Sequence, residues 1–291
     1  SADSPDFRRI GLAACAVHRH DPGPLLIGAL SDDDPVVRSR ALRAVGELGR
    51  EDLLPILTDH FNEEDNTCKF WAAWSAGLFN SQSAVLVLRN IAEGRGIHSM
   101  KACEMAVRNM NLSDAHEWLR ELAQKPEFIR LAITGYGIIG DPVIITWLIQ
   151  MMEVPEMARV AGEAVTMITG VDIAYEDLDG ELPEGFETGP TENPDDEDVD
   201  LDPDEDLPWP EPSQISEWWN KNKGSFKNNS RYMLGKIISS ENLFNTLKEG
   251  LQRQRAKAAI ELAMHHSDQM LFEVRAPGNF QKELLLSKGA K

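Results

Sequence analysis

The sequence predicts an all-α solenoid of stacked helix pairs that is interrupted by an acidic insertion. Three observations lead to this prediction. Stretches of the first 170 residues superpose on one another at a spacing of about 31 residues, which is typical of stacked two-helix repeats. Within each stretch, apolar residues recur three and four positions apart, as one face of a helix requires. Acidic residues, finally, are concentrated in the single segment 172–212.

The repeating unit is clearest at residues 34–49. Asp34 is placed to cap a helix, and Pro35 follows at the first helical position, where the missing N–H costs nothing. Small residues such as Ala41 and Ala44 on the apolar stripe allow a neighbouring helix to approach closely, and Gly49 ends the helix. The expected helix pairs cover 23–49, 51–79, 81–110, 113–139 and 141–169.

The chain opens on the second helix of a repeat, because Ser4 and Pro5 match Asp34 and Pro35. We therefore expect the first repeat to be incomplete. One face of this opening helix is apolar, and its residues are Ile10, Leu12, Ala13 and Val17. Terminal repeats normally carry a polar outer face, so either another molecule covers this face or residues that precede it are absent from the sequence.

The segment 172–212 contains 18 Asp and Glu, seven prolines, and no Lys or Arg. It accounts for nearly all of the net charge of −19, since the rest of the chain carries −1. This composition predicts a loop or a disordered insertion. We divide the chain into repeats at 1–170, an acidic proline-rich insertion at 171–212, and C-terminal helices at 213–291 that continue the stack and end in an extended tail.

No catalytic site, metal site or cofactor is predicted. Cys15, Cys68 and Cys103 occupy alanine-rich packing positions, which favours free structural thiols over a disulfide framework or a zinc site and indicates a reducing cytoplasm. The carboxylates at 198–206 resemble the start of an EF-hand loop. Pro203 and Trp209, however, occupy the positions that need a glycine and a bidentate glutamate.

Membranes and nucleic acids are not expected as partners. No run of 18 apolar residues is present, as a membrane-spanning helix would need. Lys and Arg are scattered through the repeats, and the acidic insertion would oppose a polyanion. A protein partner is the remaining prediction, with an oligomeric state that the sequence leaves open.

Two groups of residues are candidates for binding that partner. The first lies on or near the ridge of the repeats and comprises Arg38, Arg40, Arg43 and Lys69. The second lies in the insertion and comprises Asp200, Asp202, Asp204 and Trp209, where one aromatic side chain between prolines 208 and 210 supplies a contact anchor. The insertion could bind the basic region 221–257, in this chain or on a partner, could mimic nucleic-acid charge, or could be a solvated linker.

The stretch DPVVRSRALRAVGELG at 34–49 resembles the HEAT-like repeats related to those of phycobilisome lyases. No bilin site is recognisable, so the lyase activity is not carried over. A narrower resemblance rests on segments spread over most of the chain: GLAACA (11–16), WAAWSA (71–76), TMITG (166–170), WW (218–219), RYMLG (231–235), RQR (253–255) and LFEVRAP (271–277). They are similar to a bacterial HEAT-like-repeat family of unknown function associated with type VI secretion loci.

The resemblance implies an accessory or interaction role around secretion, and it supplies no catalytic residues. Members of that family are usually longer at the N-terminus, in agreement with the incomplete first repeat. The predicted function is a non-catalytic cytoplasmic scaffold or adaptor, such as an effector chaperone or an immunity protein. Two alternatives remain open: a metal-dependent enzyme that uses carboxylates of the insertion such as Glu176, Asp177 and Asp179, and a structural subunit of a larger assembly.

Overall fold

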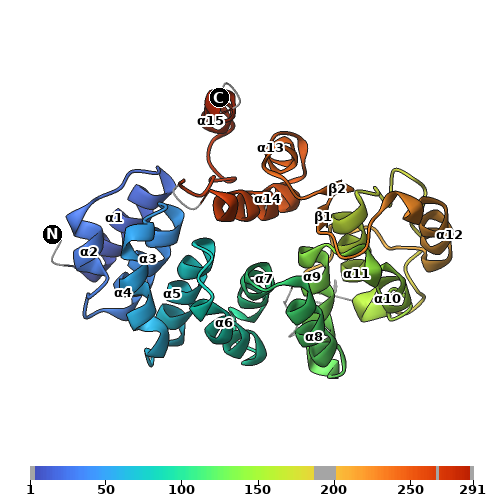
Figure 1. Cartoon of the computed structure of the whole chain (residues 1–291), viewed down its shortest axis with the longest axis horizontal. Helices are drawn as coiled ribbons and strands as arrows, with labels where there is room; N and C mark the ends of the chain where they lie inside the picture. The colour runs from blue at the N-terminus through green and yellow to red at the C-terminus, as the bar shows by residue number, and fades with distance from the viewer. Residues whose placement is uncertain (1–3, 187–200, 267–268, 289–291) are drawn as a thin grey trace, which may run out of the picture. The chain divides into compact units, whose positions relative to one another are not determined.

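The computed structural model describes residues 4–186, 201–266 and 269–288. These residues form two compact units, shown in Figure 1. The first unit joins the N-terminal part of the chain, 1–111, to its C-terminal part, 239–291. The second unit is the intervening stretch 112–238. The unit boundaries therefore fall at 111/112 and 238/239, whereas the composition suggests boundaries at 170 and 212.

Helix pairs from the N-terminal part and helices from the C-terminal end build the first unit. The N-terminal helices are α1 (Pro5–Val17), α2 (Pro24–Ala29), α3 (Pro35–Glu47), η1 (Glu51–Leu53), α4 (Leu54–Asp59), η2 (His60–Asn62), α5 (Asn66–Leu78), α6 (Ser83–Glu93) and α7 (Ser99–Asn109). The C-terminal helices are α13 (Ser240–Glu249), α14 (Gln252–His265) and α15 (Gly278–Lys288).

The second unit is also helical, with one short hairpin. Its helices are α8 (Leu112–Ala123), η3 (Pro126–Phe128), α9 (Ile129–Ile139), η4 (Pro142–Ile144), α10 (Ile145–Met151), α11 (Pro155–Thr169), α12 (Pro212–Asn222) and η5 (Lys223–Ser225). Strands β1 (Tyr232–Met233) and β2 (Lys236–Ile237) pair antiparallel, with Tyr232 opposite Ile237 and Met233 opposite Lys236.

The second helices of the pairs confirm the predicted repeat, because they begin 26 to 33 residues apart. Their first residues are Pro5, Pro35, Asn66, Ser99, Ile129 and Pro155. The predicted cap is also confirmed: Asp34 Oδ1 accepts hydrogen bonds from the N–H groups of Val36 (2.8 Å) and Val37 (3.2 Å). The fold is thus an α-solenoid, as the periodicity predicts.

Small residues bring α3 and α5 close together. A Cβ on Gly46 would lie 2.7 Å from Ser75 Oγ, so only glycine fits at this position. The same hydroxyl donates a hydrogen bond of 2.7 Å to the carbonyl oxygen of Leu42. Ala41, Ala72 and their neighbours on the stripes are fully buried. Small residues at the stripe positions therefore allow the close contact between these repeat helices.

The acidic insertion is a loop where it is described, as predicted, and part of it belongs to the core of the second unit. Ile173 and Leu178 are buried and pack in the same cluster as Ile168, Ile215 and Trp219. The flanks of the insertion, 171–186 and 201–212, are described, and 187–200 lie outside the described residues. The acidic composition of the segment drew attention away from these few apolar side chains. They pack in the core and so fix the flank that carries them.

Residues 213–291 are predicted to continue the stack, and the structure divides them. Helix α12 does so, since it packs on α10 within the second unit. Helices α13 to α15 belong instead to the first unit, where Figure 1 shows α14 on the side formed by α3, α5 and α7. Asn80 Nδ2 donates to the carbonyl oxygen of Met264 (2.9 Å) and links α14 to the repeats. The buried alanines of α14 need such a partner surface.

Candidate functional site

An irregular stretch of the C-terminal part, residues 269–277, crosses the first unit and is here called the covering segment. Leu271 N donates to the carbonyl oxygen of Glu47 at the end of α3 (3.1 Å), and Arg19 Nε donates to the carbonyl oxygen of Leu271 (2.5 Å). From the other side, Gln252 and Gln281 donate to the carbonyl oxygen of Val274 at 2.8 and 2.9 Å. The repeats and the C-terminal helices therefore hold the main chain of the covering segment between them.

A buried carboxylate on α3 forms ion pairs with two of the predicted binding residues. Glu47 is 4% exposed, although it lies on a helix next to solvated charges. Its Oε2 lies 2.8 Å from Arg40 Nη2, and its Oε1 accepts a hydrogen bond of 2.8 Å from Arg43 Nε. One carboxylate thus serves two arginines, and Arg40 Nη1 has no further hydrogen-bond partner among the described residues.

The covering segment and α14 add two more carboxylates that arginines use. Glu273 lies 3.5 Å from Arg19 and 3.3 Å from Arg275. Glu261 on α14 accepts a hydrogen bond of 3.0 Å from Nε of Arg108 on α7, and the Arg108 side chain is fully buried. Together with Arg40 and Arg43, five arginines share three carboxylates in this region.

Burial lowers the pKa values of two of these arginines. Burial lowers the pKa of Arg19 below its ordinary value, and the nearby charges of Glu47 and Glu273 offset this only in part. Burial likewise lowers the pKa of Arg40; Glu47 opposes the shift and Arg43 adds to it. Burial and like charges both disfavour the protonated form of a guanidinium. The nearby carboxylates therefore do not fully offset the burial of Arg19 and Arg40.

A cavity of about 250 Å³, here called the charged cavity, lies among these groups within the first unit. Five cations and three carboxylates line it, which leaves a net charge of +2. The cations are Arg19, Arg43, Lys101, Arg108 and Arg275. The carboxylates are Glu47, Glu104 and Glu273. Trp71 at the same cavity has the Arg43 guanidinium 4.5 Å from its ring centroid, a cation–π contact that orients Arg43.

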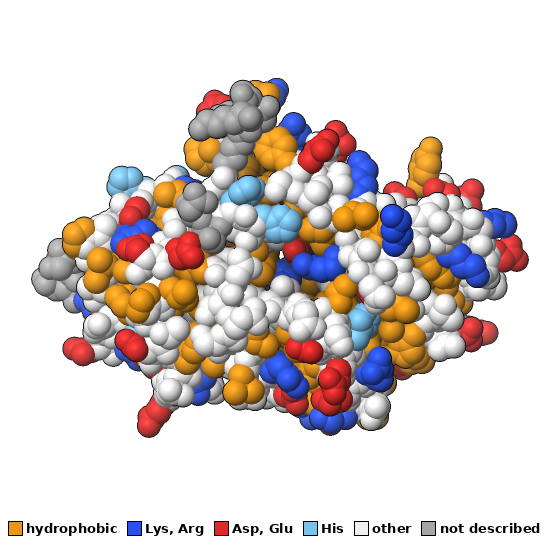
Figure 2. All heavy atoms as spheres, in the orientation of Figure 1, with side chains coloured by type: hydrophobic (Ala, Val, Ile, Leu, Met, Phe, Trp, Pro, Cys, Tyr) orange, Lys and Arg blue, Asp and Glu red, His pale blue; other side chains and the backbone are white. Residues whose placement is uncertain are grey.

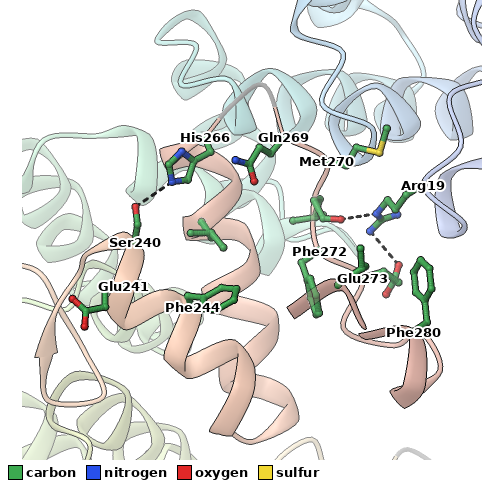
Figure 3. A pocket seen from close by; sticks show the side chains of 13 residues that line it. Arg19, Ser240, Glu241, Phe244, His266, Gln269, Met270, Phe272, Glu273 and Phe280 are labelled. Carbon is green, nitrogen blue, oxygen red and sulfur yellow. Dashed lines mark hydrogen bonds and ion pairs between the residues drawn. The ribbon is translucent and has the colours of Figure 1, made fainter. Parts of the chain in front are cut away.

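A larger and mostly apolar pocket, here called the apolar groove, lies on the other side of the covering segment. Figure 3 shows Phe244, Met270, Phe272 and Phe280 around this groove, which has a volume of about 910 Å³. Figure 2 shows hydrophobic side chains gathered beside α13 and α15. Polar groups stand at the edge: Arg19 pairs with Glu273, and Ser240 Oγ lies 3.2 Å from His266 Nε2.

The predicted ridge residues separate into two pairs. Arg40 and Arg43 enter the charged network around the cavity. Arg38 lies elsewhere, because its Nε donates to Glu63 (2.7 Å) and its Nη1 donates to the carbonyl oxygen of Asp32 (2.6 Å). Lys69 is half-buried on α5 and does not line the cavity.

Sequence reasoning missed the residues that define the charged cavity. Arg108 and Glu47 are buried although they lie off the predicted apolar stripes of α7 and α3. In the sequence, such positions resemble those of solvated charges, so no local signal distinguishes these two residues. Glu261 and Glu273 gave no signal either, because only the tertiary structure brings α14 and the covering segment to the repeats.

The predicted binding residues of the insertion are engaged within the second unit. Arg130 holds Asp204 through two hydrogen bonds (2.8 and 2.5 Å), and Asp204 is 7% exposed. Arg159 Nη2 donates to Asp202 (2.5 Å). Trp209 is half-buried, and its carbonyl oxygen accepts a hydrogen bond of 2.9 Å from Gly180 N. Trp209 thus anchors the insertion internally.

Asp200, the remaining predicted residue, lies outside the described residues. Binding to the basic region 221–257 of the same chain is one of the alternatives that the sequence leaves open for the insertion. Asp202 and Asp204 pair with arginines of α11 and α9 instead. The bidentate geometry of a guanidinium suits a carboxylate better than the point charge of a lysine does.

The carboxylates of the enzyme alternative do not converge. Glu176, Asp177 and Asp179 are all exposed on the first flank of the insertion. In the part of the chain that the structure describes, no group of three His, Cys, Asp or Glu residues is placed to hold a metal ion. The exposed carboxylates are arranged as solvated charges there.

The cysteines lie at packing positions, as the sequence predicts. Cys68 and Cys103 are buried, Cys15 is half-buried, and all three are free thiols. Burial raises the pKa of Cys68 and of Cys103 above the ordinary value, so both stay protonated at neutral pH.

Comparison with known proteins agrees with the helix pairs. The family model for HEAT repeats matches residues 1–77 and, in a second alignment, 23–95. Neither a search of curated proteins nor a search of solved structures found a match. Among the described helices, none is both long and apolar enough to cross a membrane. The chain carries HEAT repeats in an α-solenoid, and HEAT repeats generally mediate protein–protein interaction.

Proposed function

We propose that this chain is a non-catalytic scaffold that binds a protein partner through its first unit. The observation that carries the proposal is the covering segment, an extended stretch that the repeats already hold by its main chain. Glu47 O accepts from Leu271 N, and Arg19 donates to Leu271 O. Main-chain hydrogen bonds of this kind are how many domains recognise extended peptides. The first unit therefore has the chemistry of a peptide-binding surface.

The apolar groove is the proposed docking site, and its occupant is an apolar peptide segment of the partner. The groove is continuous with the interface around the covering segment, since Leu271, Phe272 and Glu273 line both. Aromatic side chains such as Phe244 and Phe280 provide the contact area that usually dominates binding energy. Arg19, Glu241 and Glu273 at the edge would fix the orientation of the bound segment.

The finer proposal is a cytoplasmic adaptor, effector chaperone or immunity protein linked to type VI secretion. It is supported by the resemblance of segments such as 11–16, 71–76 and 271–277 to a family found near such loci. Under this proposal, the apolar segment in the groove belongs to an effector or to a component of the secretion machinery. Free thiols support a reducing compartment.

The test is affinity capture from host lysate, read by mass spectrometry, with a matched pair of baits. Phe280→Asp places a charge in the apolar groove. Ile97→Asp makes the same change at a side chain that is 90% exposed and lies outside the groove. We expect a single effector or secretion component to be enriched by the wild type and by Ile97→Asp, and to be lost with Phe280→Asp.

The captured protein is then purified and titrated against the three baits by calorimetry. A loss of affinity confined to Phe280→Asp supports the groove as the docking site. Equal affinity for all three baits would show that the groove is not the docking site. Enrichment of no protein above a tag-only control would refute the scaffold proposal itself.

A structural subunit is a second candidate, favoured by exposed apolar side chains on the first two helices. Phe7 is 69% exposed and Ile10 is 54% exposed on α1, and Leu25 is 67% exposed on α2. Exposed apolar surface often marks interfaces. Light scattering of the wild type and of Phe7→Asp tests this candidate: a concentration-dependent oligomer that Phe7→Asp dissociates supports it, and a monomer at all concentrations rejects it.

A further inference from the structure

We propose that the charged cavity of the first unit is a binding site for a small organic anion with a carboxylate or phosphate group. The site consists of Arg108 at its floor, Arg43 and Lys101 beside Trp71, and Arg19 and Arg275 at the covering segment. It does not depend on the proposed protein partner. Four features of the site indicate such a ligand: its charge, an unpartnered buried donor, an apolar wall and its volume.

The charge of the site favours an anion. Arg40 and Arg43 share Glu47, Arg19 and Arg275 share Glu273, and the cavity wall as a whole has a net charge of +2. Lys101 and Arg275 are exposed to solvent, so part of this positive charge lies where a charged ligand can reach it. An oxyanion between the arginines would complete the neutralisation that the three carboxylates begin.

Arg108 provides the donor that points to a ligand. Its Nε donates to Glu261 (3.0 Å) and its Nη1 donates to the carbonyl oxygen of Glu104 (2.8 Å). Its Nη2 is buried and has no hydrogen-bond partner among the described residues, while the residue lines the cavity. A fully buried guanidinium nitrogen without a partner is rare and costly. An oxygen atom of the ligand would accept this hydrogen bond.

The remaining wall is apolar, and this indicates an organic anion in place of bare phosphate. Trp74 and Met105 from the repeats and Ala259 and Ile260 from α14 form it. Small-molecule sites typically combine such a wall with a few convergent polar groups. The volume of about 250 Å³ suits a small ligand.

The test is calorimetric titration of the full chain with two organic oxyanions, phenyl phosphate and benzoate, which separate the phosphate arm from the carboxylate arm. Inorganic phosphate tests the contribution of the apolar wall, and benzyl alcohol tests the contribution of the charge. We expect at least one organic oxyanion to bind with 1:1 stoichiometry, more tightly than inorganic phosphate. Absence of binding by both oxyanions at 10 mM, or equal binding of benzyl alcohol, would overturn the proposal.

A matched pair of lysine variants places the anion in the cavity. Lys101→Gln removes a charge from the cavity wall, and Lys69→Gln removes one from the neighbouring helix outside it. Loss of one charge-assisted contact should weaken binding about 10-fold in Lys101→Gln. Lys69→Gln should bind like the wild type. Equal weakening in both variants would mean that the anion responds only to the overall charge.

Arg108→Gln tests the floor of the site. Glutamine retains a donor for Glu261 but removes the buried charge, so we expect affinity to fall by about 10-fold or more. Circular dichroism compares its folding with that of the wild type, and Lys101→Gln keeps the proposal falsifiable if Arg108→Gln does not fold. A folded Arg108→Gln that binds the anion as tightly as the wild type would exclude Arg108 as the anchor and overturn the assignment.

Discussion

Both units cover their repeat helices with chain from outside the repeats, but they neutralise the enclosed arginines differently. In the second unit, Arg130 is paired with Asp204 and Arg159 with Asp202 among the described residues. In the first unit, two arginines share Glu47 and two share Glu273. The carboxylates of the acidic insertion thus neutralise these two arginines of the second unit, whereas the covering segment leaves positive charge around a cavity. This difference separates a structural ion-pair network from a candidate ligand site.

The largest expected effect compares one ion pair from each unit. Glu261→Ala leaves the fully buried Arg108 without its carboxylate and should lower the free energy of unfolding by about 3–5 kcal/mol. Asp204→Ala leaves Arg130, whose side chain is 32% exposed and can be hydrated, and should cost about 1–2 kcal/mol. Urea unfolding followed by tryptophan fluorescence measures both. Equal losses would show that burial does not distinguish the two networks.

The second prediction compares two glycines that follow the ends of repeat helices. At each of them, a segment from a distant part of the chain lies close to the backbone. A Cβ on Gly140 would lie 2.1 Å from the carbonyl oxygen of Tyr232, and one on Gly49 would lie 2.8 Å from that of Gln269. Both glycines have positive φ, which an alanine adopts only at a cost of about 1–2 kcal/mol. We expect Gly140→Ala to lower the free energy of unfolding by about 3 kcal/mol and Gly49→Ala by somewhat less.

Gly23→Ala is the control for this pair. Gly23 also has positive φ, with a ψ of −122°, and has no atom within 4 Å of an added Cβ, so it measures a backbone cost of about 1–3 kcal/mol without a clash. Thermal denaturation of the three variants compares them directly. A Gly140→Ala variant as stable as Gly23→Ala would mean that the hairpin at 232–237 can move away from α9 without loss.

The third prediction is a pH dependence that is specific to the first unit. Burial alone would raise the pKa of Glu273, but the N–H of Arg275 and the charges of Arg19 and Arg275 outweigh it and hold the pKa below the ordinary value of 4.5. A lowered carboxyl pKa stabilises the folded state above the unfolded-state pKa, and this contribution is lost as the pH falls through the folded-state pKa.

Wild type should therefore be more stable than Glu273→Gln at pH 7, and the difference between them should shrink as the pH falls below 4.5. Thermal midpoints between pH 7 and pH 3 measure this difference. Lys221→Gln, an exposed change in the second unit, provides the control profile. A difference between wild type and Glu273→Gln that stays constant with pH would contradict the role given to the Glu273 charge.

The smallest expected effect concerns how the insertion is held. Arg159→Gln removes the partner of Asp202 and should speed hydrogen exchange at Gly180 and Glu211, whose N–H groups link the two flanks of the insertion. Lys221→Gln lies in the basic region that is one of the alternative binding sites for the insertion. It should leave both rates within about 2-fold of the wild type, as a surface charge of little energetic weight would.

The repeats could be predicted from the sequence because their signals are local. The cap at Asp34, the proline after it and the small residues at 41 and 44 each act within one helix or between adjacent helices. The candidate site could be predicted only in part. Arg40 and Arg43 were identified as charges on a repeat ridge, but their partner Glu47 is buried on the same helix and resembles any other solvated glutamate in the sequence.

The C-terminal part illustrates why the remaining contacts of the fold and the site could not be predicted from the sequence. Its helices have the same periodicity as the repeats, so continuation of the stack was the natural prediction. In the structure, α14 brings Glu261 to Arg108, which is 153 positions away in the chain. The acidic composition of the insertion likewise concealed Ile173 and Leu178, which form part of a core that spans distant residues.

The sequence by itself determined the helical repeat, its period, its caps and the position of the acidic insertion, because all of these depend on contacts within about one repeat. The tertiary structure alone decided which surface the C-terminal helices cover, which arginines the insertion neutralises and which remain around the charged cavity. Those outcomes depend on the burial of charge between segments far apart in the chain. The cost of leaving a buried charge unpaired acts through space, and periodicity along the sequence does not contain it.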